Sequence, residues 1–297
     1  MSGEPILCCS GLGKRYGRRT WALRDCDLEL PRGGIVGLVG ANGAGKSTLL
    51  HLAIGLLRPT EGSVRMFGEP LRVDQADGLA RIGFVAQDHP LYRRFTVADL
   101  LHFGRSTNRR FDLAGARDRL DGIGITLERR ASTLSGGQQA QIALTLALAK
   151  RPRLLVLDEP VASLDPLARR DFLRTLVDAV AGSVAGDDLT VVLSSHVVAE
   201  LERVCDHLVL LDEGRVRLAG AIDDLLAEHR VLVGPRADDL DTMDGVIAAS
   251  HGQRHSNMLV RLPGPTSPHP RWESHPVGLE ELVLAYLGEG RNRPCSG

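Results

Sequence analysis

The nine-residue stretch GANGAGKST, residues 40–48, constrains the fold of this chain more strongly than any other feature. It follows an apolar run at residues 35–39 that has the length and composition of a buried strand, and it leads into Leu49 and Leu50. Glycines allow a backbone to curl tightly, and consecutive N–H groups at the start of a helix form a nest that binds anions. The sequence therefore predicts a strand, a phosphate-binding loop and a helix in succession.

The spacing within this loop, Gly40-x4-Gly45-Lys46-Ser47, is that of the Walker A P-loop. We expect Lys46 to contact the outer phosphates of a nucleoside triphosphate and Ser47 to ligate Mg²⁺. The loop by itself leaves a kinase, a GTPase and a motor protein open. Its predicted nucleotide-binding residues are Gly40, Asn42, Gly43, Gly45, Lys46, Ser47 and Thr48.

A second motif, LLVLDEP at residues 154–160, combines a short apolar strand with two carboxylates at its end. Asp158 is suited to binding Mg²⁺ through water, and Glu159 follows where a general base could polarise an attacking water. A single acidic residue at the end of a strand is common. The evidence for a catalytic site therefore comes from the two adjacent carboxylates. The pair favours hydrolysis of the bound triphosphate.

The order of apolar segments predicts an α/β fold. Three short strands, LLVLD, TVVLSS and HLVLLD, are separated by helix-length intervals, which is the pattern of a parallel sheet covered on both faces. Strands at residues 6–12 and 22–30 make the start of the chain rich in β-structure. Helices are expected at residues 96–103, 113–120 and 137–149.

The pentapeptide LSGGQ, residues 134–138, stands directly before the helix that leads into LLVLDEP. Ser135 can cap that helix, while Gly136 and Gly137 expose N–H groups at its start, which predicts a second phosphate site in the same chain. Here the sequence resembles the nucleotide-binding subunit of an ATP-binding-cassette (ABC) transporter, whose LSGGQ signature is highly specific. An ordinary serine-capped helix is the alternative, and the order of the other motifs argues against it.

Four further residues match motifs of this family in the family's order. Tyr16, in KRYG, resembles the aromatic residue that stacks on adenine, and Gln87, in FVAQDHP, resembles the glutamine that reaches Mg²⁺ and the attacking water. Asp165 lies in a segment similar to the D-loop, and His196 resembles the switch histidine that contacts the γ-phosphate. Taken alone, the tyrosine and the histidine would more often be structural residues. The resemblance implies catalytic roles for Glu159, His196 and Gln87, metal binding by Ser47, Gln87 and Asp158, and nucleotide contacts by Tyr16, Ser135, Gly136, Gly137 and Asp165.

The resemblance also implies a P-loop NTPase fold of ABC type. Its parts would be a RecA-like parallel sheet core, an N-terminal antiparallel β-subdomain and a helical signature subdomain at about residues 88–150. Together they would form a nucleotide-binding domain over residues 1–220. Residues 221–297 are expected to form a small α+β accessory domain, with a short helix, a strand pair, a proline-rich loop at 264–276 and an amphipathic helix from Leu279.

Members of the family act as a head-to-tail pair, so the resemblance implies that ATP on one P-loop is capped by Ser135 and Gly137 of a second copy. It implies an ATPase that uses ATP and Mg²⁺ and drives a permease on a separate chain, at the cytoplasmic face of the cell membrane. Every motif residue is present, so a homodimer needs no other ATPase. The chain departs from the family at Gln141 and Leu146, where many members carry arginine, but these positions lie on the signature helix rather than at the phosphate.

One segment favours export through a permease of the ABC-2 or drug-resistance type, and a second is expected to contact the permease. The carboxy-terminal GLEELVLAYLG resembles an extension found in that branch, and residues 89–105 lie where the family forms the groove for a permease helix. Tyr92, Phe95 and Leu100 are candidates to line the groove, although packing within the helical subdomain explains them equally well. A soluble single-cassette scaffold of the iron–sulfur assembly type shares all of the motifs and stays the alternative.

Composition argues against a nucleic-acid-binding, secreted or membrane-spanning protein. A net charge of -1 gives no electrostatic case for a nucleic-acid partner, which usually requires a basic excess. The start, MSGEPILCCSG, lacks the features of a signal peptide, and the longest mostly apolar run, residues 142–149, is far shorter than the roughly 20 residues of a membrane span. We therefore expect no membrane span in this chain. Five cysteines without metal-ligand spacing suit a reducing cytoplasm.

Overall fold

The computed structural model describes residues 4–71, 76–183, 188–236, 245–262 and 272–292. Its centre is a six-stranded sheet in the order β10-β9-β3-β8-β7-β6, in which only β10 runs antiparallel to its neighbour. The predicted parallel sheet of an α/β fold is thus confirmed. Its strands are β3 (Gly34–Val39), β6 (Ile82–Val85), β7 (Leu154–Leu157), β8 (Thr190–Ser195), β9 (His207–Asp212) and β10 (Arg215–Ala221).

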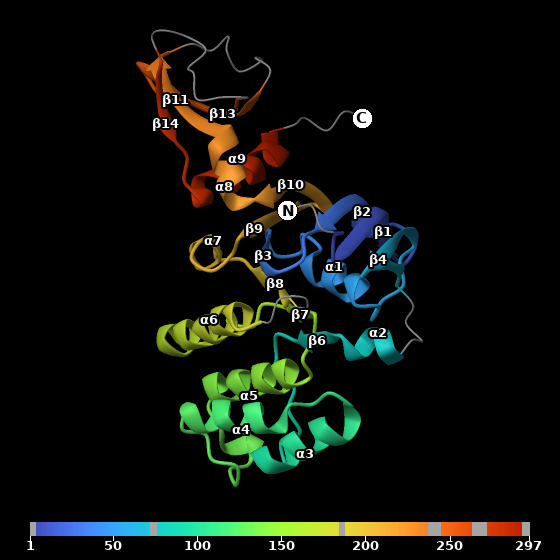
Figure 1. Ribbon diagram of the computed structural model, residues 1–297. Helices are drawn as coiled ribbons and strands as arrows, with labels where there is room; N and C mark the ends of the chain where they lie inside the picture. Colours follow the sequence, from blue (N-terminus) through green and yellow to red (C-terminus); the bar gives the residue numbers. More distant parts are fainter. Residues whose placement is uncertain (1–3, 72–75, 184–187, 237–244, 263–271, 293–297) are drawn as a thin grey trace.

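Helices cover both faces of this sheet, which is why its strands read as continuous apolar runs. Successive side chains of a strand point to opposite faces. Val36 of β3 packs in one cluster with helix α1 (Lys46–Ala53), whereas Ile35 packs in the other with α5 (Gly136–Ala149) and α6 (Pro166–Ala181). The loops that follow the parallel strands therefore meet at one edge, between the helical layers (Figure 1).

An antiparallel sheet at the start of the chain packs on the α1 side of the core. It has the order β2-β1-β4-β5, and one face shares a hydrophobic cluster with α1. This is the predicted N-terminal β-subdomain, although its first two strands extend beyond the predicted residues 6–12 and 22–30. The strands are β1 (Leu7–Tyr16), β2 (Thr20–Leu30), β4 (Glu61–Met66) and β5 (Glu69–Pro70).

The chain between β6 and β7 forms a helical region with its own apolar cluster, at the lower end of the molecule in Figure 1. Ser135 starts α5 with a capping box to Gln138, as the sequence predicted for the cap itself. The most apolar of these helices, α5, has 14 residues, and no helix in the described ranges is long and apolar enough to cross a membrane. The remaining helical elements are α2 (Ala76–Ala80), which precedes β6 and was not predicted, α3 (Val97–Thr107), α4 (Leu113–Gly122) and the 3-10 turn η1 (Ala131–Thr133).

The chain after β10 forms a third sheet, in the order β12-β13-β11-β14, together with two helices. The predicted strand pair and both predicted helices are present, but β11 was not predicted. The prediction of a loop over residues 264–276 is wrong at its end, where residues 273–276 pair with β11; residues 264–271 lie outside the described ranges. Proline is tolerated there because β14 is an edge strand. The elements are α8 (Ile222–Glu228), β11 (His229–Pro235), β12 (Val246–His251), β13 (His255–Arg261), β14 (Glu273–Pro276) and α9 (Leu279–Asn292).

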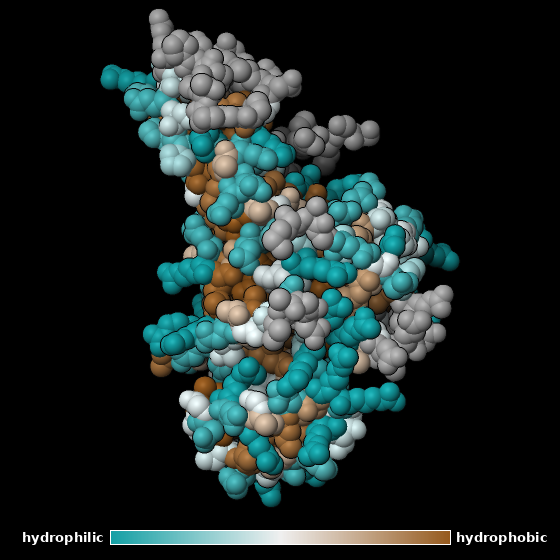
Figure 2. Space-filling view, viewed as in Figure 1, coloured by the Kyte–Doolittle hydropathy of each residue, from teal (hydrophilic) through white to brown (hydrophobic). Residues whose placement is uncertain are grey.

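The last helix joins this third sheet to the main core. Figure 2 shows a band of apolar side chains, in brown, over this junction. His229 is fully buried there: its Nδ1–H donates to the carbonyl oxygen of Leu225 at 2.7 Å, and its Nε2 accepts from the Tyr286 hydroxyl at 2.8 Å. Burial lowers the pKa of His229. The α9 residues that pack in the same cluster as the parallel sheet are Leu279, Leu282, Val283 and Tyr286.

Candidate nucleotide-binding site

The P-loop joins β3 to α1 at the edge of the sheet where the parallel strands end. Gly43 and Gly45 adopt positive φ angles of 84° and 105°, which residues with a Cβ rarely adopt. At Gly40 a Cβ would overlap the carbonyl oxygen of Leu211 on β9. Sterics thus require glycine at these positions, and they leave the backbone N–H groups accessible. Asn42 and Ser47 are exposed and Thr48 is half-buried in the first turn of α1.

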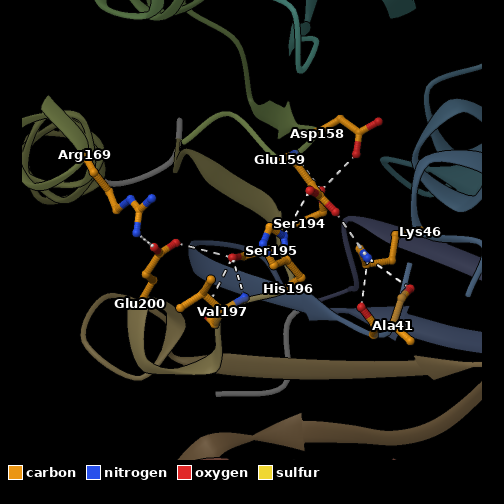
Figure 3. A network of polar contacts seen from close by, with 11 residues as sticks. Ala41, Lys46, Asp158, Glu159, Arg169, Ser194, Ser195, His196, Val197 and Glu200 are labelled. Atoms are coloured by element: carbon orange, nitrogen blue, oxygen red, sulfur yellow. Dashed lines mark hydrogen bonds and ion pairs between the residues drawn. The ribbon is translucent and has the colours of Figure 1, made fainter. Parts of the chain in front are cut away.

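Lys46 is buried and folds back over its own loop (Figure 3). Its Nζ donates to the carbonyl oxygens of Gly40 at 2.8 Å and of Ala41 at 3.2 Å. The same Nζ lies 3.3 Å from Oε1 of Glu159. A buried ammonium is costly unless it is paired and hydrogen-bonded. Glu159 therefore supplies here the negative charge that a phosphate would otherwise supply.

Asp158 and Glu159 follow β7 and are held by a serine from the neighbouring strand. Asp158 is buried, and its Oδ1 accepts a hydrogen bond from Ser194 Oγ at 2.9 Å. The same Oγ accepts from the backbone N–H of Glu159 at 2.8 Å. Ser194, the last residue but one of β8, thus fixes the direction of both acidic residues. The sequence did not predict this role of Ser194, although a polar residue near the end of a buried strand is a signal for it.

The Glu159 carboxylate lies between Lys46 and His196. Its Oε1 pairs with Lys46, and its Oε2 lies 3.1 Å from Nδ1 of His196. An ionised carboxylate can only accept, so Nδ1 of His196 carries the proton and Nε2 is the nitrogen left for a ligand. The backbone of Glu159 has a φ of 43°, a left-handed conformation that is uncommon for a residue with a Cβ. Such strain is often found where a side chain must be aimed at a reacting group.

His196 is itself held by a network that the sequence did not predict (Figure 3). Ser195 Oγ donates to Oε2 of Glu200 at 3.3 Å and accepts from the backbone N–H two residues further on at 3.0 Å. Glu200 is buried on α7 (Val198–Leu201) and pairs with Arg169 of α6. The network therefore ties the loop that carries His196 to the helix that follows Asp165.

Three predicted residues lie around this centre without touching it. Tyr16 ends β1 with 47% of its surface exposed, which suits stacking on a base better than the core packing considered as its alternative. Gln87 lies in an exposed turn directly after β6. Asp165 caps α6, because its Oδ1 accepts from the N–H groups of residues 167 and 168, each at 3.0 Å.

The signature turn lies at the N-terminus of α5. Ser135 and Gly136 are exposed, and a Cβ on Gly136 would meet nothing within 4 Å. A Cβ on Gly137 would come within 2.7 Å of the Cβ of Ala168, so packing against α6 requires that glycine. Within the described ranges, no hydrogen bond or ion pair joins this turn to Lys46 or Glu159. One chain thus brings together the P-loop, the acidic pair and His196, but not the signature.

The residues fit a magnesium–triphosphate ligand. The glycines leave room for phosphate oxygens at the helix N-terminus, and Lys46 is already paired with an anion that a phosphate can replace. Mg²⁺ takes oxygen ligands, and the Asp158 carboxylate and the exposed Ser47 hydroxyl supply them. When bound, ATP supplies the anhydride bond that water cleaves, and Mg²⁺ neutralises charge on its phosphates.

Comparison with known proteins decides the family. Residues 23–162 match the family model described as ABC transporter. The Nod factor export ATP-binding protein I of Ralstonia nicotianae is 30% identical over 317 residues, which cover 97% of this chain and 95% of that protein. The chain belongs to the ABC transporter family as an ATP-binding subunit.

Other relatives of this ABC subunit act in import. The molybdenum import ATP-binding protein ModC of Pseudomonas aeruginosa is 35% identical over 249 residues, covering 81% of this chain but only 67% of that protein. Among solved structures, cbiO1 of Clostridium perfringens, part of an ABC transporter complex, aligns with a TM-score of 0.63 at 26% identity, over 76% of this chain and 92% of that one.

Membership of the family establishes the coarse activity. This ABC subunit is an ATPase that uses ATP and Mg²⁺ and works with a membrane permease. The predicted P-loop fold of ABC type, the enzyme class and the cofactors are therefore confirmed.

Proposed function

We propose that this ABC subunit powers export through a permease of the ABC-2 type on a separate chain, at the cytoplasmic face of the cell membrane. The observation that carries the proposal is a match in overall length. The Nod factor export protein aligns with nearly the whole chain and is itself nearly wholly covered, whereas ModC extends well beyond its match. The alignment with the export protein therefore includes most of the third sheet and α9.

We also propose the domain division expected from the sequence. A nucleotide-binding domain covers residues 1–220, with its helical subdomain at about 88–150, and an accessory domain covers residues 221–297. The third sheet supports this division because it shares no strand with the central sheet. Since α9 packs in the core cluster of the nucleotide-binding domain, the accessory domain is firmly attached to it.

In the proposed reaction Glu159 takes a proton from the attacking water as general base. His196 orients the Glu159 carboxylate through Nδ1, at 3.1 Å, and presents Nε2 to the outer phosphate. Lys46 exchanges its ion pair with Glu159 for the phosphates, which releases the carboxylate to act on water. Asp158, Gln87 and Ser47 are the proposed Mg²⁺ residues.

The proposed dimer explains the position of the signature. Ser135 and Gly136 are exposed and are not joined to the P-loop of their own chain. In a two-fold, head-to-tail pair, the turn at residues 135–137 of one copy closes over ATP on the P-loop of the other, and Tyr16 stacks on the adenine. Each of the two sites then contains residues from both copies, with Asp165 close to their junction.

A groove of about 470 Å³ between the core and the helical region is the proposed seat of the permease. Tyr92 and Leu100 line it, as expected, and Leu79 and Phe103 add exposed apolar surface. Phe95 does not line the groove but packs on Tyr92, with ring centroids 5.0 Å apart. Exposed aromatic side chains around an apolar groove are typical of a site that receives a helix.

Import is the second candidate, because the ModC relative shares 35% identity over most of this chain. A tagged Glu159→Gln variant, which keeps the nucleotide dimer, should be captured from detergent-solubilised membranes in the presence of ATP. Recovery of an ABC-2 type permease supports export. Recovery of an importer-type permease supports the second candidate. Recovery of neither contradicts both candidates.

A further inference from the structure

A second pocket, of about 600 Å³, lies beside the permease groove and is lined by the end of α2, the end of α3 and the residues that follow α5. Five of its nine lining residues are arginine or lysine, and none is acidic. Because the net charge of the chain is only -1, this is a local concentration of positive charge. We call it the cationic pocket; its charged residues are Arg81, Arg109, Arg110, Lys150 and Arg151.

Most of these charges lack an acidic partner. Arg151 pairs with Asp112 at 3.0 Å. Arg81 lies over the ring of Phe67, with its guanidinium carbon 5.7 Å from the ring centroid. Arg109 and Arg110 are exposed in the loop between α3 and α4, and neither forms an ion pair within the described part of the chain. The pocket therefore presents uncompensated positive charge.

Lys150 contributes a partly buried positive charge to the lining of the pocket. Its Nζ donates to the carbonyl oxygen of Ile82 at 2.7 Å, and no carboxylate neutralises it in the described residues. Burial lowers the pKa of Lys150, because one carbonyl oxygen replaces only part of the lost hydration. An anion in the pocket would stabilise this ammonium.

The dipole of α5 accounts for only part of this arrangement. Lys150 and Arg151 follow the last residue of α5, and cations at a helix C-terminus are stabilising. That explanation does not extend to Arg81, which precedes β6, or to the pair Arg109 and Arg110. Three separate segments therefore bring cations to one concave surface.

We propose that the cationic pocket binds the phosphate headgroups of anionic phospholipids in the membrane that holds the permease. The orientation rests on the proposed function: the pocket shares Leu79 and Lys150 with the groove assigned to the permease, so the two adjoin each other. Arginine forks bind phosphate oxygens in bidentate pairs, and basic residues beside a membrane are attracted to its anionic lipids.

A lipid surface fits this pocket better than an acidic protein segment does. Protein segments bind mainly through a central, buried apolar or aromatic anchor. Leu79 is the only large apolar side chain among the residues that line the pocket, and the apolar surface belongs to the neighbouring groove. A phosphate headgroup needs charge and hydrogen-bond donors, which the pocket has.

The test uses the purified full chain and sedimentation with vesicles. One set of vesicles contains phosphatidylcholine alone, and the other contains equal parts of phosphatidylcholine and phosphatidylglycerol. We expect binding only to the second set. The double variant Arg109→Gln, Arg110→Gln should bind about 25-fold more weakly, because each arginine near an anionic surface contributes roughly fivefold. The matched control is Arg170→Gln, Arg174→Gln on α6, which removes the same charge from exposed residues and should bind as the parent does.

Each outcome decides the proposal. Equal binding by the two double variants overturns the assignment to the pocket, and failure of the parent chain to bind anionic vesicles overturns lipid binding itself. If the double variant loses both vesicle binding and basal ATPase activity, it is misfolded. The single variants Arg109→Gln and Arg110→Gln then repeat the test. An acidic peptide that binds the parent chain but not the Arg109 and Arg110 double variant, with no vesicle binding by either, would identify a protein partner instead. No permease is present in the vesicle assay, so its result does not depend on whether the export proposal is correct.

Discussion

Glu159 and Lys46 form an ion pair across the predicted active site, with Oε1 of the carboxylate 3.3 Å from Nζ of the ammonium. The other carboxylate oxygen of Glu159 lies 3.1 Å from Nδ1 of His196. The predicted general base therefore forms an ion pair with the lysine that is expected to bind the phosphates. A phosphate that reaches Lys46 must displace Glu159, so substrate binding and release of the base are coupled.

Glu159→Gln should keep ATP binding and lose turnover. Removing the negative charge takes away the competitor for Lys46, while the amide cannot accept a proton from water. We expect hydrolysis to fall by about 10²–10⁴-fold and ATP affinity to stay the same or rise. Phosphate release and size-exclusion chromatography with saturating ATP measure the two effects. Monomeric elution under those conditions would contradict the proposed role. Glu202→Gln, which changes an exposed acid directly after α7, serves as the control.

Lys46→Ala should abolish tight nucleotide binding. Hydrogen bonds to a charged group contribute roughly 1.5–3 kcal/mol, so affinity should fall about 10–100-fold. Titration calorimetry with ATP measures the loss. Ser47→Ala should instead lower affinity only when Mg²⁺ is present, which separates the metal contribution from the phosphate contribution. Unchanged affinity in the lysine variant would refute the assignment of the P-loop.

Glu200→Gln should slow hydrolysis without weakening ATP binding. Glu200 accepts from Ser195 and pairs with Arg169, so its charge fixes the loop that carries His196. A misplaced catalytic group can cost up to about 100-fold in rate, and we expect a loss of tenfold or more in kcat with KM nearly unchanged. Partial recovery in Glu200→Asp would support a positioning role. A parallel rise in KM would show that the network holds the nucleotide pocket instead.

Gln141→Leu should stabilise the subunit. The Gln141 side chain is buried on α5, and its Oε1 has no hydrogen-bond partner within the described residues. An unsatisfied buried acceptor costs about 1–3 kcal/mol, and leucine has a similar volume without a polar atom. We expect a gain of about 1 kcal/mol in the free energy of unfolding, measured with urea, at unchanged ATPase activity. A loss of stability would mean that Gln141 is satisfied in solution.

Stability should fall when the pH drops below about 6.5, because burial lowers the pKa of His229 from its ordinary value of 6.5. Above that value the histidine is neutral in both the folded and the unfolded chain. Below it the unfolded chain binds the proton first, so the stabilising contribution is lost as the pH falls towards the folded pKa. His89, whose pKa burial also lowers, acts in the same direction.

Urea unfolding at pH 7.5 and at pH 5.5 measures this effect, with each pH chosen on one side of the ordinary value. His229→Gln should show a smaller difference between the two conditions than the parent chain. Tyr286→Phe, which removes the hydroxyl that donates to Nε2, controls for general damage to this junction. An identical pH dependence in all three proteins would contradict the assignment to His229.

The sequence predicted the parts of the site that depend on local rules. Gly40 and Gly45 follow from steric requirements of the loop, and Ser135 follows from helix capping, so each can be read from a few neighbouring residues. The ion pair between Lys46 and Glu159 joins residues 113 positions apart, and no local pattern encodes that distance. The roles of Ser194 and Glu200 likewise depend on the order of the strands and on α6.

Three of the elements that the sequence missed, α2, β5 and β14, are short or lie at a sheet margin. β5 and α2 have two and five residues, too few for a period to be visible. Strand β14 ends in Pro276 and is exposed, so its sequence resembles a loop, and only pairing with β11 makes it a strand. β11 itself begins at His229, whose burial depends on Tyr286 from the last helix.

The separation of the signature turn from the P-loop has a genetic consequence. A copy that carries Lys46→Ala and a copy that carries Ser135→Ala are each defective in both sites when paired with themselves. When the two are mixed, one of the two shared sites in the mixed pair receives an intact lysine from one copy and an intact serine from the other. Two inactive alleles expressed together should therefore restore part of the activity, which no chain working alone could do.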